Sequence, residues 1–120
     1  MIGLGPRRMM KIQAIVREEL LDAIVERLLL IGVRGLTFGP VRGTGRTAGH
    51  REVFRGSAIH VAYAPRMLVE WYGPDNEADG VMRAIEQRAS TGKGGDGRIF
   101  VSYVEDAVRI RTGERGLDAV

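Results

Sequence analysis

The residue types best suited to binding chemistry are concentrated in residues 91–100 (TGKGGDGRIF), with four glycines between positions 92 and 97. Because glycine lacks a Cβ atom, backbone N–H groups in such a stretch can crowd around a ligand. Successive free N–H groups form a concavity that binds anions. Asp96 lies among the glycines, and Arg98 follows them with a planar guanidinium that suits phosphate. The stretch therefore predicts an anion site, although its composition suits a flexible helix-to-strand connector equally well.

The spacing of Gly92 and Gly97 matches that of a phosphate-binding P-loop, but the rest of the motif is absent. Arg98 and Ile99 occupy the positions where a P-loop has Lys and Ser or Thr. The flanks are also reversed, because a helical pattern precedes the glycines and a strand pattern follows them. A P-loop needs a helix N-terminus after the loop, so the sequence excludes a P-loop NTPase.

Length and composition place the chain among ordinary globular domains. It has 120 residues, 44% hydrophobic and 28% charged, with a net charge of +3, which suits one domain with a modest core. The lack of cysteine excludes disulfides and thiolate chemistry. Residues 1–8 have no long apolar run and are expected to form a disordered extension rather than a secretory signal. We expect residues 9–120 to form a single domain, located in the cytoplasm.

Hydrophobic periodicity predicts six regular elements. In chain order they are a strand at 11–16, a helix at 20–31, strands at 35–41 and 66–72, a helix at 81–89 and a strand at 99–104. Pro40 indicates an edge strand, and Asp75 or Asn76 is the expected N-cap of the second helix. The order β-α-β, long loop, β-α-β is typical of an α+β, ferredoxin-like βαβ-βαβ fold.

Two segments depart from this regular pattern. Residues 44–64 form a predicted loop of roughly 20 residues, and loops of that length are usually functional or disordered. In the tail, an extended conformation would place Val108 and Ile110 on one side and Arg109 and Arg111 on the other. The two guanidinium groups then form an anion clamp or, in the simpler alternative, line a solvated edge strand.

Three motifs, in their order and spacing, resemble the PII signal-transduction family over residues 9–120. The glycine stretch resembles the family's C-terminal signature, and residues 43–50 (GTGRTAGH) resemble the base of its long T-loop. Residues 108–116 (VRIRTGERG) resemble its tail. The resemblance implies a compact homotrimer with a T-loop at about 44–64, a glycine-rich B-loop at about 90–98 and a C-terminal tail at about 105–120.

The same resemblance implies a site for adenine nucleotide (ATP, ADP or AMP) in the cleft between subunits. Gly35 and Thr37 would line the adenine side, and Arg109 and Arg111 would reach across from the neighbouring subunit. The residues implied on the phosphate side are Gly45, Arg46, Thr47, Gly95, Asp96, Gly97 and Arg98.

Departures from the family pattern bear on the effector. The family binds 2-oxoglutarate through Mg²⁺, ATP and a Gln, whereas the Gln position here is Thr47 and the usual effector-binding Lys is Arg66. We therefore expect a small anion, bicarbonate, near Arg46, Thr47, His60 and Arg66, as in PII-like branches tied to carboxysomes or transporters. Conventional nitrogen regulation by ATP, ADP and 2-oxoglutarate is the alternative. Ile59 replaces the tyrosine that the family modifies, which excludes uridylylation at that position.

Three functional classes compete. A non-enzymatic regulator is favoured, in which nucleotide and effector change the T-loop conformation and thereby the binding of a partner protein. A nucleotide hydrolase is the second class, but the sequence shows no nucleophile–base pair and no acidic cluster for catalytic magnesium. A nucleic-acid binder is the third, and the strands lack the aromatic pair that stacks bases. No metal site is expected from His50 and His60, and Trp71 is expected in the core.

Overall fold

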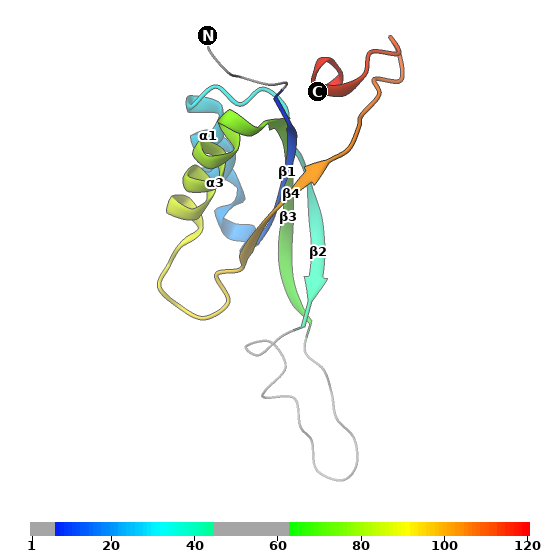
Figure 1. The fold of residues 1–120 in the computed structure, drawn as a ribbon. Helices are drawn as coiled ribbons and strands as arrows, with labels where there is room; N and C mark the ends of the chain where they lie inside the picture. The colour runs from blue at the N-terminus through cyan, green and yellow to red at the C-terminus, as the bar shows by residue number, and fades with distance from the viewer. Residues whose placement is uncertain (1–6, 45–62) are drawn as a thin grey trace.

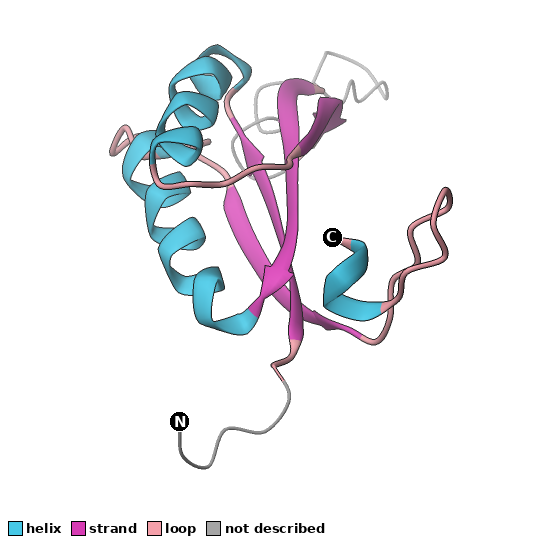
Figure 2. Ribbon diagram, turned by 90° about the horizontal axis from the view of Figure 1, so that it is seen from above, coloured by secondary structure: helices cyan, strands magenta, loops and turns pink. Residues whose placement is uncertain are grey.

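The computed structural model of the chain describes residues 7–44 and 63–120 (Figure 1). Its strands and α-helices, in chain order, are β1 (Met9–Val16), α1 (Leu21–Leu30), β2 (Thr37–Gly43), β3 (Ala64–Pro74), α3 (Asp75–Ala89) and β4 (Arg98–Val104). Two short 3-10 turns, η1 (Glu18–Leu20) and η2 (Gly116–Ala119), lie before α1 and next to the C-terminus. The strands form one sheet with both helices on the same face, and the C-terminal turn lies on the opposite side (Figure 2).

The sheet is antiparallel throughout, with the strand order β2-β3-β1-β4. β1 is central, and its Ile12 lies opposite both Trp71 of β3 and Val101 of β4. β2 pairs only with β3, so Pro40 lies in an edge strand, where its missing N–H is tolerated. This order, with a helix after the first and third strands, confirms the predicted ferredoxin-like fold. No helix within residues 7–44 and 63–120 is long and apolar enough to cross a membrane.

The core lies between the sheet and the helices. Alternate β1 residues face the helices, and Ile12, Ala14 and Val16 are at most 1% exposed. The helices contribute residues at helical spacing, which are Ile24 and Leu28 of α1 and Ala78, Val81, Ala84, Ile85 and Ala89 of α3. Trp71 is buried in this core, as expected. Gly73 leaves room for its indole ring, because a Cβ atom there would lie 2.2 Å from Cζ2 of Trp71.

The helix-free face of the sheet carries a polar cluster centred on Glu70 of β3. Its carboxylate accepts hydrogen bonds from the side-chain amide of Gln13 (3.1 Å) and from the hydroxyl of Tyr72 (3.2 Å). It also pairs with the ammonium group of Lys11 at 3.5 Å. Met9 belongs to the same face by alternation, yet it is buried, and it lines a hollow together with residues of η2.

The start of α3 differs from the sequence prediction. The apolar pattern is clear only from residue 81, because the first turns are polar apart from Ala78, and the helix begins at Asp75, one or two residues before the start that the predicted N-cap implies. Neither Asp75 nor Asn76 is the N-cap. That position is Pro74, which makes no side-chain cap bond, and the N–H of Asp75 donates to the backbone carbonyl of Arg8 (2.9 Å).

The tail is not the single extended segment that its alternating pattern predicted. The chain after β4 folds back on itself, with a β-bridge between Val108 and Arg115. The N–H of Arg109 donates to the carbonyl of Glu114 (2.9 Å), and the N–H of Gly113 donates to the carbonyl of Arg109 (2.7 Å). Residues 108–115 therefore form a tight hairpin, whose tip includes the 98% exposed Ile110.

Candidate functional site

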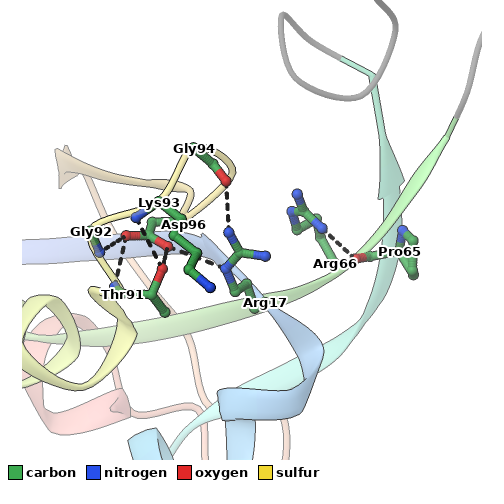
Figure 3. A network of polar contacts seen from close by, with 8 residues as sticks. All are labelled: Arg17, Pro65, Arg66, Thr91, Gly92, Lys93, Gly94 and Asp96. Atoms are coloured by element: carbon green, nitrogen blue, oxygen red, sulfur yellow. Dashed lines mark hydrogen bonds and ion pairs between the residues drawn. The ribbon is translucent and has the colours of Figure 1, made fainter. Parts of the chain in front are cut away.

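The glycine-rich loop between α3 and β4 is folded around the carboxylate of Asp96 (Figure 3). Oδ2 accepts hydrogen bonds from the N–H groups of Thr91 (2.8 Å) and Gly92 (3.0 Å), and Oδ1 accepts one from the Thr91 hydroxyl. Gly92, Gly95 and Gly97 have φ values of 80°, 91° and 101°, which side chains rarely adopt. The acid and the glycines together give the loop a defined shape, so it is more than a plain connector.

Arg17, at the end of β1, holds the loop from the other side. Its Nε lies 3.2 Å from Oδ1 of Asp96, and its Nη2 donates to the carbonyl of Gly94 at 2.7 Å (Figure 3). The residue types and motifs of the sequence do not mark Arg17 as a site residue. The topology of the sheet does indicate its position. β1 pairs with β4, and Ile15 lies opposite Arg98, so the residue after β1 must approach the loop before β4.

The hydrogen bonds at Asp96 keep its carboxyl group ionised. Its pKa is lowered from 3.8 to about 2, chiefly by the hydrogen bond from the Thr91 hydroxyl and then by that from the Thr91 N–H. Arg17 and the N–H of Gly92 lower it further. The negative charge is therefore directed into the loop and toward Arg17.

Two guanidinium groups flank the backbone at Gly95. A Cβ atom added there would lie 2.9 Å from Nη2 of Arg66 and 3.3 Å from Nη2 of Arg17. Arg66 lies near the start of β3, where its Nη1 donates to the carbonyl of Pro65 (2.9 Å; Figure 3). The structure thus brings the predicted effector residue Arg66 to the predicted phosphate residue Gly95, in an electropositive environment suited to an anion.

Gly97 has a packing role that the sequence did not reveal. A Cβ atom at this position would lie 1.7 Å from the backbone carbonyl oxygen of Ile15. Only glycine therefore allows the loop to approach β1 and lead directly into β4. Gly97, Asp96 and Arg98 line a hollow of about 350 Å³ against α3, which we call the loop hollow.

Gly35 and Thr37 lie in a different place. They line a hollow of about 640 Å³, here called the β2–β3 hollow, which is formed by residues 32–37, residues 70–74, Glu77, Leu117 and Val120. No residue of the glycine-rich loop lines it. The predicted site residues within the described chain therefore form separate groups, one at the glycine-rich loop and one at the β2–β3 hollow.

The tail arginines occupy the hairpin. Nε of Arg109 lies 3.6 Å from the carboxylate of Glu114, and Arg111 lies in the turn at the tip. At the base of the hairpin, Asp106 forms an ion pair with Arg115 and accepts N–H bonds from Ala107 (2.8 Å) and Gly116 (3.2 Å). These contacts, led by the hydrogen bond from Arg115, lower the pKa of Asp106.

The remaining predicted residues, Gly45, Arg46, Thr47, Ile59 and His60, lie outside the described residues. Within residues 7–44 and 63–120, no group of three or more His, Cys, Asp or Glu side chains is placed to hold a metal ion.

Fold and loop together define a ferredoxin-like domain with a structured glycine-rich loop at one end of its sheet. The family model described as "Nitrogen regulatory protein P-II" matches residues 9–114. A nitrogen regulatory protein P-II of Rhizobium meliloti (strain 1021) is 46% identical over 112 residues, which are 93% of this chain and 100% of that protein.

Two solved structures share the fold. A Bacillus subtilis GlnK–ATP complex has a TM-score of 0.76 and 29% identity, covering 94% of this chain and 98% of the other. Arabidopsis thaliana PII bound to citrate has a TM-score of 0.77 and 33% identity, covering 95% and 94%. The chain belongs to the P-II family of nitrogen regulatory signalling proteins, as its sequence motifs predicted.

Proposed function

We propose that this protein is a regulator that binds adenine nucleotide between the subunits of a homotrimer and transmits the bound state through its T-loop. The observation that carries the proposal is the shape of the glycine-rich loop. Hydrogen bonds to the carboxylate of Asp96 fix this shape, and Arg17 and Arg66 flank the loop at Gly95. Such a loop suits the phosphates, which need N–H donors and positive charge. The similar GlnK that was solved as an ATP complex supports the same ligand class.

The two separate groups of site residues support a site completed by a neighbouring subunit. The loop side is cationic, whereas the β2–β3 hollow carries two carboxylates, Glu70 and Glu77, against one guanidinium, Arg34, and so suits a neutral base better than a phosphate. In the proposed trimer, one nucleotide would bridge a glycine-rich loop and a β2–β3 hollow from facing subunits. Arg109 and Arg111 of the neighbour would reach the phosphates.

The proposed effector is a small anion beside Arg66. Bicarbonate remains our first candidate, because Thr47 replaces the Gln that holds magnesium for 2-oxoglutarate in the family and Arg66 replaces the Lys. The specific observation that favours 2-oxoglutarate is the similarity to relatives named for nitrogen regulation. With either effector, the anion would use the charge of Arg66 next to Gly95.

Calorimetric titration tests both levels of the proposal. ATP, ADP and AMP are each titrated alone, with bicarbonate, and with 2-oxoglutarate plus Mg²⁺. We expect nucleotide binding that bicarbonate strengthens. If only 2-oxoglutarate with Mg²⁺ strengthens ATP binding, the effector is 2-oxoglutarate and not bicarbonate. The absence of any nucleotide binding would contradict the proposed function itself.

A further inference from the structure

The C-terminal turn η2 lies against the hollow that holds Gly35 and Thr37. Leu117, within η2, and Val120, the last residue, both line the β2–β3 hollow. Figure 2 shows this turn on the side of the sheet opposite the helices, apart from the hairpin that precedes it. The chain therefore supplies an apolar wall to this hollow from its own end, far in sequence from the residues that form the rest of it.

The position of η2 is set by the base of the hairpin. The N–H of Gly116, the first residue of the turn, donates to the carbonyl of Ala107 (2.9 Å) and to Oδ1 of Asp106 (3.2 Å). Arg115, directly before the turn, forms the ion pair with Asp106. These exposed contacts are individually modest, so the turn is anchored but can be displaced.

Leu117 separates two spaces. On one side it lines the β2–β3 hollow, and on the other it lines a hollow of about 470 Å³ together with Arg8, Met9 and Tyr103. The guanidinium of Arg8 lies 4.7 Å from the ring centroid of Tyr103, and this cation–π contact helps to fix the wall of the second hollow. The leucine is half-buried between them, and a movement of η2 would change the depth of both spaces.

We propose that η2 is a lid of the β2–β3 hollow, in which Leu117 and Val120 pack against the base of a bound nucleotide and the Asp106–Arg115 ion pair keeps the lid in place. The inference rests on the proposed nucleotide site and adds to it a contact that discriminates the base. Because the contact is apolar, it stabilises the base end of the ligand and leaves the phosphate end unaffected.

The test compares Leu117→Ser with Asp118→Ser by calorimetry. Asp118 lies in the same turn, but it is exposed and does not line the hollow. ATP reports on base and phosphates together, whereas inorganic tripolyphosphate reports on the phosphate end alone. We expect Leu117→Ser to lower the affinity for ATP about tenfold, because that is the scale of the free energy gained by burying part of a leucine side chain. Tripolyphosphate affinity should stay unchanged, and Asp118→Ser should match the wild type for both ligands.

Unchanged ATP affinity in Leu117→Ser would contradict the proposed lid. An equal loss of affinity for ATP and tripolyphosphate would contradict it too, because the substitution would then act on the phosphate end and not on the base. Hydrogen exchange of the free protein keeps the inference separate from the proposed function. If the wild type binds no ATP, the nucleotide site fails. The lid is then judged by whether Leu117→Ser, and not Asp118→Ser, speeds amide exchange in residues 32–37. Equal exchange rates in the two variants would refute it.

Discussion

Asp96 places a carboxylate inside the loop that we propose as the phosphate site. Both of its oxygens accept hydrogen bonds from the loop, and Arg17 lies beside it. The acid therefore shapes the loop by binding the N–H groups of Thr91 and Gly92. Its sequence position alone, among glycines, is equally compatible with a ligand-binding role and with this structural one.

The lowered pKa of Asp96 predicts how the loop responds to acid. The folded-state pKa of about 2 lies below the ordinary 3.8. The stabilising contribution is therefore complete above pH 4 and is lost as the pH falls toward 2. We expect the amides of Thr91 and Gly92 to stay protected from exchange at pH 4 and to lose protection near pH 2. NMR hydrogen exchange measures this, with Asp96→Ala as the control that has no side-chain acceptor at any pH.

Gly97 and Gly92 form a matched pair for separating collision from backbone strain. Both have positive φ, but only a Cβ at Gly97 would collide with the backbone, at Ile15. We expect Gly92→Ala to lower the free energy of unfolding by about 1–2 kcal/mol and Gly97→Ala by about 3 kcal/mol or more. Urea unfolding compares the two variants. Similar losses of unfolding free energy in the two variants would mean that β1 moves aside to accommodate the Cβ atom at position 97.

At the scale of elements, the order and type of the six main elements followed from hydrophobic period alone. The boundaries did not, because they depend on partners. β2 spans Thr37–Gly43, two residues beyond the predicted 35–41, since its pairing with β3 extends to Gly43 opposite Ala64. The hairpin in the tail depends on contacts between residues near 106 and 116, which an alternating pattern cannot indicate.

The candidate site was predictable to a similar degree. The glycine-rich loop and Arg66 were found from residue types and from family resemblance, and the structure brings Arg66 to Gly95. Arg17 was missed because its role depends on the pairing of β1 with β4, which composition does not show. The packing role of Gly97 was missed for the same reason.

Arg17 gives the element-scale prediction, since it joins the end of β1 to the loop before β4. We expect Arg17→Ala to weaken ATP binding about tenfold or more, because the variant loses a charge-assisted hydrogen bond to the carbonyl of Gly94 and positive charge beside Gly95. Calorimetry measures the change. Arg83→Ala is the control, because its pair with Asp79 is exposed on α3 and worth little. Equal ATP affinity in the two variants would remove Arg17 from the site.

At the scale of the whole molecule, the helices leave one sheet face that the C-terminal turn covers only in part, and two edge strands that pair on one side only within the described chain. Phe100 of β4 lies opposite Gln13, on the helix-free face, and is 48% exposed. Edge strands β2 and β4 also carry backbone groups without a sheet neighbour on their outer sides. A second and third copy of the chain would cover these surfaces, which is the physical reason to expect the trimer.

The last prediction separates assembly from folding. Phe100→Glu places a charge on the helix-free face, and we expect it to yield a folded monomer, because burying an unpaired carboxylate in the subunit contact is unfavourable. Leu30→Glu is the control, since Leu30 is 71% exposed at the end of α1 on the other side of the molecule. Light scattering after gel filtration gives the mass of each variant, and circular dichroism checks the fold. We expect the Phe100→Glu monomer also to lose ATP binding, because the glycine-rich loop and the β2–β3 hollow of the proposed site come from facing subunits. A Phe100→Glu trimer would place the contact elsewhere, and ATP binding by a monomer would show that one chain is sufficient for the site.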